Sequence, residues 1–221
     1  MTIKERYTRV IGWFRVNMPV AETELRHDNP YQLMVAVILS AQCTDKRVNL
    51  ITPAFYEKYP TLESLASARQ EEVLEIIRSC SYPNNKAGHL IHASQAIMNK
   101  FNGRIPEEVE ELITIPGIGR KTANVIASVA YNKQALAVDT HVHRVSARIG
   151  LTAKAKTPLE TERQLTAHIP PELHSIAHHW LILHGRYVCL ARKPRCTECG
   201  LKDYCRYYSV NQGNQICPCS S

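Results

Sequence analysis

Four cysteines near the C-terminal end of the chain have the residue type and the spacing of a metal centre. Cys189, Cys196, Cys199 and Cys205 form a C-x6-C-x2-C-x5-C pattern within 17 residues, so four thiolates can meet at one centre. Zinc sites usually pair two short C-x2-C knuckles, whereas this run has one, and it matches neither common ferredoxin spacing. The spacing therefore predicts a metal centre and favours neither zinc nor an iron–sulfur cluster.

Basic residues lie around this run and throughout the chain. Arg192, Lys193 and Arg195 fall between the first two cysteines, where they suit contacts with a phosphate backbone or simply balance four thiolates. Lys and Arg total 27 against 20 Asp and Glu, giving a net charge of +7 and a pI of about 9.0. This balance makes nucleic acid the leading class of partner.

A second motif joins two expected helices through a short glycine-containing hairpin, residues 115–119. Its glycines, Gly117 and Gly119, permit a positive φ and a close approach of the backbone to a ligand. Amides there, with Ile118 between them, can point at a phosphate oxygen without reading the base sequence. Taken alone, a P-G-x-G loop more often needs glycine for its geometry only.

Two ionisable residues after the hairpin have the chemistry to break a glycosidic bond. Lys121 lies in the first turn of the second helix, where the helix macrodipole disfavours an ammonium group. It therefore binds phosphate, or acts as a nucleophile whose pKa is lowered by the dipole and by burial. Asp139 can stabilise positive charge on a sugar or transfer protons, although alone it reads as the N-cap of a helix over 142–149.

The elements that position these residues are predicted to be helical. A segment over 31–41 is apolar around its whole circumference and is expected to be the central buried helix. Only 134–138 reads as extended, so the fold class is all-α, and the polar tail from Ser209 is expected to be frayed. Apolar residues at helical spacing predict further helices at 7–14, 48–59, 71–80, 86–101, 106–113 and 175–187.

Targeting signals are not recognisable in the sequence. Charged residues interrupt the first 19 positions, and the longest apolar run, 33–39, is too short to span a membrane. We expect a cytoplasmic protein, associated with the nucleoid if bacterial, whose thiols are reduced or bind metal. Outside the four-cysteine run, Cys43 and Cys80 are expected to be buried free thiols, and the Cys217/Cys219 pair is too isolated for a site.

Together these motifs resemble the endonuclease III family, bifunctional DNA glycosylases of the helix-hairpin-helix superfamily. The resemblance implies two lobes: a six-helix barrel over 22–132, with the helix-hairpin-helix at about 107–130, and a lobe of 1–21 and 133–208 around a 4Fe-4S cluster. Residues 209–221 would form a disordered tail. The motifs that carry it are Ile115–Asn124, Val138–Arg144, Ser40–Asp45, His178–Tyr187 and the four-cysteine run.

The resemblance also implies a mechanism. Lys121 matches the family's catalytic lysine, which attacks C1′ of a flipped-out oxidised pyrimidine, and Asp139 matches its catalytic aspartate. A Schiff base then forms, and β-elimination nicks the strand 3′ to the lesion. The expected partner is double-stranded DNA with oxidised pyrimidines or abasic sites, the expected state is a monomer, and the cluster would be structural or charge-relaying.

Three more residues are assigned through the resemblance. Gln42 lies where the family places a side chain that fills the gap left by the flipped base. Asn84 is the candidate wedge, in a segment that looks one residue longer than the family's Tyr-Asn-x-Lys form because Pro83 intervenes. His141 lines the pocket or packs behind the catalytic aspartate.

Two rival functions remain at the level of sequence. An adenine-mispair glycosylase shares the fold and cluster spacing but normally lacks the hairpin lysine and carries an additional domain, so Lys121 and the length of 221 residues argue against it. In a non-catalytic iron–sulfur module that binds DNA or senses redox state, Lys121 would contact phosphate only. A covalent enzyme–DNA intermediate discriminates these readings.

Overall fold

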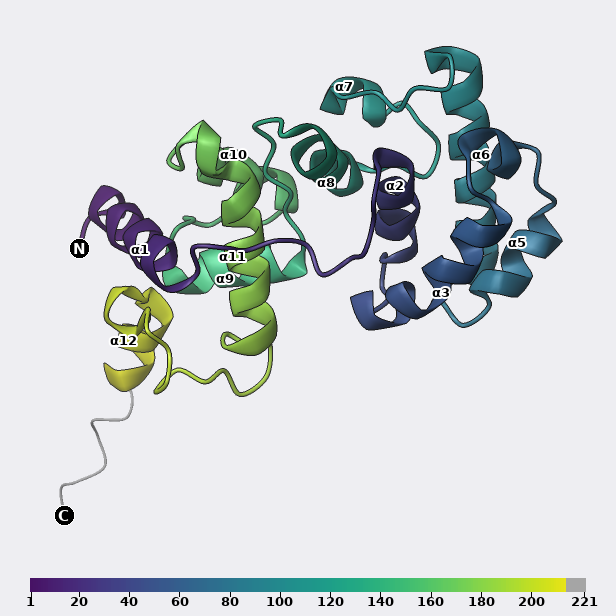
Figure 1. The fold of residues 1–221 in the computed structure, drawn as a ribbon. Helices are drawn as coiled ribbons and strands as arrows, with labels where there is room; N and C mark the ends of the chain where they lie inside the picture. The colour runs from purple at the N-terminus through teal and green to yellow at the C-terminus, as the bar shows by residue number, and fades with distance from the viewer. Residues whose placement is uncertain (214–221) are drawn as a thin grey trace. The chain divides into compact units, whose positions relative to one another are not determined.

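The computed structural model describes residues 1–213, which are helical with no strand among them (Figure 1). Contacts divide the chain into two compact units: Thr23–Ala135, and Met1–Glu22 together with the chain from Leu136 onward. The boundaries expected from sequence were 21/22 and 132/133. Cys217 and Cys219 lie outside the described residues. Within the described part of the chain, no helix is long and apolar enough to cross a membrane.

The continuous unit is built around α2 (Pro30–Leu39). Asn29 caps this helix by accepting a hydrogen bond from the Gln32 amide, and Pro30 begins it, as the sequence pattern predicts. Every residue of α2 after Pro30 except Gln32 is buried, because the helix contacts α3, α6 and α8. The other helices of the unit are α3 (Asp45–Lys58), α4 (Leu62–Ala66), α5 (Gln70–Ile77), α6 (Pro83–Phe101), α7 (Val109–Leu112) and α8 (Arg120–Tyr131).

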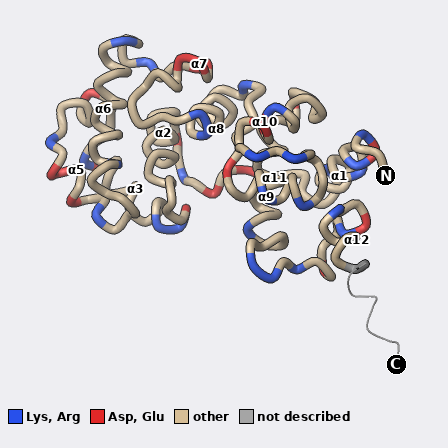
Figure 2. The backbone as a smooth tube through the Cα atoms, turned by 180° about the vertical axis from the view of Figure 1, so that it is seen from behind, with Lys and Arg blue, Asp and Glu red and all other residues tan. Residues whose placement is uncertain are grey.

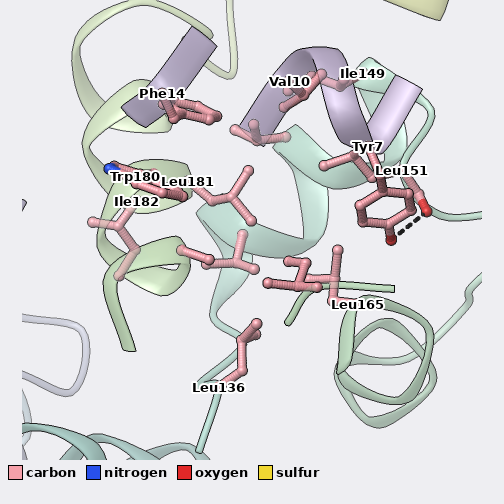
Figure 3. Close-up of a cluster of buried hydrophobic side chains, with 14 of the residues drawn as sticks. Tyr7, Val10, Phe14, Leu136, Ile149, Leu151, Leu165, Trp180, Leu181 and Ile182 are labelled. Carbon is pink, nitrogen blue, oxygen red and sulfur yellow. Dashed lines mark hydrogen bonds between the residues drawn. The ribbon is translucent and has the colours of Figure 1, made fainter. Parts of the chain in front are cut away.

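The other unit brings the N-terminal helix onto the C-terminal part of the chain (Figure 3). Phe14 stacks on Trp180 with ring centroids 5.4 Å apart, and the Tyr7 hydroxyl donates to the Leu151 carbonyl at 2.8 Å. These contacts join segments that lie far apart in sequence around one apolar core. The helices of the unit are α1 (Ile3–Asn17), α9 (Thr140–Ile149), α10 (Pro158–Thr166), α11 (His174–Tyr187) and α12 (Arg206–Gly213).

Several boundaries differ from the sequence prediction. The helix expected over 106–113 is only the four-residue α7, and α4 and α10 were not predicted. Both of these begin at a threonine, Thr61 or Thr157, whose side chain accepts from a first-turn amide, so their capping signals were readable. The tail expected to fray from Ser209 instead continues α12 as far as Gly213.

Candidate active site and metal centre

The hairpin of residues 115–119 packs tightly against α6 at one glycine and is open at the other. Gly117 has φ +81°, and a Cβ atom placed there would lie 2.6 Å from Cβ of His89. Gly119 has φ −84° and nothing within 4 Å of such an atom, so the prediction of positive φ holds for Gly117 alone. Gly117 is therefore required by the fold, whereas Gly119 leaves space beside the backbone. Ile118 is buried between them.

Lys121 follows at the second position of α8. Gly119 is the N-cap of this helix and supplies no side-chain hydrogen bond, so first-turn amides of α8 are not satisfied by a capping side chain. The Lys121 side chain is partly buried in this setting. An ammonium or amine thus stands beside amides that favour an anionic ligand.

Asp139 combines the two roles that its sequence position suggested. Its Oδ1 accepts hydrogen bonds from the amides of His141 and Val142, both at 2.8 Å, and so caps α9. Its Oδ2 lies 3.0 Å from Nδ1 of His141, and the carboxyl side chain is only 20% exposed. Oδ1 is thus used to cap the helix, and Oδ2 is the oxygen that faces His141.

The electrostatic surroundings keep Asp139 ionised. Burial by itself would raise the pKa of this carboxyl, but the hydrogen bonds from Val142 and His141 and the charges of His141 and His178 outweigh it and hold the pKa below its ordinary value. His178 is buried, and its Nδ1 is 2.7 Å from the Ala137 carbonyl, two residues before Asp139. His141 is thus the histidine that contacts the Asp139 carboxylate directly, and His178 acts on it through its charge. Because its pKa is lowered, Asp139 carries a negative charge at neutral pH.

Gln42 and the segment that precedes α6 lie side by side. The Ser81 hydroxyl donates to the Gln42 carbonyl at 2.7 Å, and both Gln42 and Tyr82 have left-handed backbones, with φ of +52° and +53°. Gln42 and Asn84 are exposed, but Asn84 lies within the first turn of α6 rather than in a loop. Tyr82 was missed by the sequence reasoning, although it is 63% exposed. A large aromatic residue between Ser81 and Pro83, immediately before a helix, was the available signal.

The four cysteines line one hollow in the unit with α9 and α11, together with Arg148 and His184. Among the described residues, no three His, Cys, Asp or Glu side chains converge closely enough to hold a single ion. Four thiol side chains around one hollow form the usual donor set of an iron–sulfur cluster.

The surroundings of these thiols are partly apolar and partly cationic. Burial raises the pKa of the Cys199 and Cys205 thiols, so thiolates there need a compensating positive charge of the kind that bound metal supplies. A guanidinium nitrogen of Arg148 lies 3.5 Å from the Cys189 sulfur. Arg192 and Lys193, by contrast, are exposed, and Lys and Arg recur along the chain that follows α11 (Figure 2).

Comparison with known proteins decides the family. A family model for HhH-GPD superfamily base excision DNA repair proteins matches residues 35–171, and one for the iron–sulfur binding domain of endonuclease III matches residues 189–205. Endonuclease III of Bacillus subtilis is 46% identical over 188 residues, covering 85% of this chain and 86% of that protein. The chain belongs to the endonuclease III family.

Further relatives agree with this assignment. Endonuclease III of Escherichia coli is 39% identical over 204 residues, covering 92% of this chain and 96% of that protein. A solved structure of a trapped endonuclease III–DNA covalent intermediate has a TM-score of 0.91 at 41% identity and covers 96% of this chain and 100% of that one. As a member of the family, the protein is a base-excision-repair DNA glycosylase with abasic-site lyase activity, and its cofactor is an iron–sulfur cluster. The adenine-mispair and non-catalytic alternatives are not favoured.

Proposed function

We propose that this enzyme removes oxidised pyrimidines from double-stranded DNA and cleaves the strand at the abasic site, with Lys121 as nucleophile and Asp139 as the charged partner. The observation that carries the proposal is Lys121 at the start of α8, a helix without a side-chain cap, directly after a hairpin that is open at Gly119. This arrangement provides amides that can bind a DNA phosphate, and it places the amine of Lys121 in the first turn of the same helix.

The two ionisable residues divide the chemistry between them. Nζ of neutral Lys121 forms a bond to C1′ of the damaged nucleotide while the bond from C1′ to the base breaks and the base departs with the electron pair. The Asp139 carboxylate, held ionised by its hydrogen bonds, stabilises the positive charge that develops on the sugar. Nζ then loses a proton and the sugar ring opens as the C1′–O4′ bond breaks, which leaves a protonated Schiff base between Lys121 and C1′. Loss of a C2′ proton with departure of the 3′ phosphate oxygen then breaks the C3′–oxygen bond by β-elimination and nicks the strand.

We further propose that the iron–sulfur cluster is of the 4Fe-4S type, held by one thiolate each from Cys189, Cys196, Cys199 and Cys205. Four cysteine ligands are the usual set for such a cluster. The same unit presents Arg192 and Lys193 outward, so a loop organised by the cluster would place two cations against a phosphate backbone. The cluster thereby supports DNA binding rather than the bond-breaking step.

On the DNA-contacting side of the continuous unit, Gln42 would fill the gap left by the flipped nucleotide. Tyr82, next to the Ser81 that bonds to Gln42, fits the wedge role better than Asn84, because an exposed aromatic ring can stack on a base pair whereas Asn84 lies in the first turn of a helix. His141 would orient the Asp139 carboxylate from within the same helix turn. We expect the protein to act as a monomer in the cytoplasm, at the nucleoid where its substrate lies.

The experiment that tests the nucleophile is covalent trapping with borohydride. A duplex with one thymine glycol is incubated with the protein and borohydride, which reduces a Schiff base to a stable amine. The unmodified protein should yield a covalent complex, and Lys121→Ala should yield none while still binding the duplex. Lys133→Ala, which changes a partly buried lysine two residues beyond the end of α8 that pairs with Glu107 and Glu108, is the matched control and should be trapped normally.

Two results would count against the proposal. Trapping of Lys121→Ala at the normal rate would assign the nucleophile to another amine. Binding without trapping or nicking by the unmodified protein, on thymine glycol and on an abasic site alike, would exclude a Schiff-base mechanism. Trapping on the abasic site only would retain the lyase and reject oxidised pyrimidines as substrates.

A further inference from the structure

A second pair of cysteines lies outside the four-cysteine run, beside the candidate DNA-contact residues. Ser81 donates to the Gln42 carbonyl at 2.7 Å, which brings the adjacent Cys80 and Cys43 side by side although 36 residues separate them in the sequence, and the Cys43 thiol influences the ionisation of Cys80. Both are free thiols; Cys80 is 5% exposed, whereas Cys43 is half-buried rather than buried as the sequence suggested. Two neighbouring thiols of this kind are what a disulfide requires, because it joins Cβ atoms that lie about 3.8 Å apart.

The backbone around the pair is held together by two contacts. Ser81, next to Cys80, donates to the carbonyl of Gln42, next to Cys43. The buried ammonium of Lys86 donates to the Leu39 carbonyl at 2.7 Å and so ties α6 to the end of α2. The two segments that carry the thiols are thus already fixed side by side, and no large rearrangement is needed to join the sulfur atoms.

The different exposure of the two thiols sets an order of reaction. Cys43 can be reached by a small oxidant from solvent, whereas Cys80 cannot. Burial, with a contribution from the neighbouring Cys43, raises the pKa of the Cys80 thiol to about 11. Cys80 therefore stays protonated until the Cys43 sulfur has been oxidised and can accept a bond from it. Cys43 is therefore the site of first oxidation and Cys80 the resolving thiol.

We propose that Cys43 and Cys80 form a reversible disulfide that switches the Gln42 and Tyr82 loops out of their DNA-binding arrangement. A peroxide is the oxidant: the Cys43 sulfur takes one oxygen from it and becomes a sulfenic acid, releasing water. The Cys80 sulfur then bonds to Cys43, and the sulfenic oxygen leaves as a second water. Two thiols and one hydrogen peroxide give one disulfide and two waters, and a small thiol reverses the step.

The consequence for DNA rests on the proposed function. Drawing the two sulfur atoms to the disulfide length of about 2.05 Å shifts the segments that carry them. Gln42 directly precedes Cys43 and Tyr82 follows Cys80 by two residues; both already have left-handed backbones, which leave them little freedom to absorb a shift. Because stacking of an aromatic ring on a base contributes to nucleic-acid affinity, we expect the oxidised protein, with Tyr82 displaced, to bind lesion DNA about tenfold more weakly.

Peptide mapping tests the bond itself. The holoprotein is treated with one equivalent of hydrogen peroxide, free thiols are blocked, and the protein is cleaved with trypsin without reduction. The expected product is the peptide His27–Lys46 joined to Ser79–Lys86, each of which contains one cysteine. The joined peptide should be absent after treatment with a small thiol. Its absence from the peroxide-treated sample would overturn the proposal.

Binding measurements test the switch, with Cys43→Ser and Cys80→Ser as separate controls that retain the four cluster cysteines. Affinity for a duplex with one abasic-site analogue should fall in the peroxide-treated unmodified protein, recover with the small thiol, and stay constant in both variants. A joined peptide with unchanged affinity would reject the switch. Failure of the untreated protein to bind would instead reject the proposed function, while peptide mapping would still decide the disulfide.

Discussion

Replacement of Gly117 by alanine should separate the structural need for glycine in the hairpin from its contact with DNA. Alanine would hold a left-handed backbone at φ +81°, which costs about 1–2 kcal/mol. Its Cβ would also meet Cβ of His89 at 2.6 Å, and relief of such an overpacked contact typically costs about 1–3 kcal/mol. Together these give roughly 2–5 kcal/mol, a large share of the total stability of about 5–15 kcal/mol.

Thermal unfolding of the holoprotein measures this loss. For a chain of this size, each kcal/mol lowers Tm by about 2–4 °C, so the Tm of Gly117→Ala should be roughly 4–20 °C lower. Gly119→Ala is the matched control, because its φ is −84° and its Cβ would meet nothing within 4 Å. That variant should lose no more than about 1 kcal/mol of stability but bind an abasic-site duplex about tenfold more weakly, since its methyl group fills the space beside the amides.

The refuting results differ for the two positions. A Gly117→Ala protein with unchanged Tm would show that the hairpin does not pack on α6 as described. A Gly119→Ala protein that keeps full DNA affinity at the same salt concentration would show that these amides do not approach phosphate.

Three further changes test the remaining parts of the site. Asp139→Asn keeps a capping side chain but removes a carboxyl whose pKa is below its ordinary 3.8, so it removes the stability that this charge contributes above about pH 4 and loses at lower pH. The free energy of unfolding in urea should therefore differ less between neutral pH and about pH 3 than it does in the unmodified protein. Nicking should fall roughly a hundredfold. Cys205→Ser should lower iron content and visible cluster absorbance together with Tm; a full iron complement would exclude this residue as a ligand. Tyr82→Ala should weaken duplex binding by about 1–3 kcal/mol without changing Tm. Tyr187→Ala, which changes another exposed tyrosine, should bind normally. Equal binding by the two variants would reject Tyr82 as the wedge.

Much of the architecture was readable because the signals were local. The apolar circumference of 31–41 predicted a buried helix. The structure buries α2 because apolar side chains on all of its sides are more stable out of water. Asp139 was readable as an N-cap because a capping bond spans only two or three residues. Short helices such as α4 escaped prediction because one or two turns carry too little periodicity to stand out.

The sequence by itself determined the helical class, the four-cysteine run and the lysine after the hairpin, since each depends on residue type and near-neighbour spacing. Tertiary structure alone decided which glycine is constrained, because the contact of Gly117 with His89 joins α6 to the hairpin. It also decided that Tyr82 is exposed and that the segments carrying Gln42 and Cys43 and carrying Cys80 and Ser81 lie side by side. Such contacts depend on how helices pack in three dimensions, and no local pattern in the chain records them.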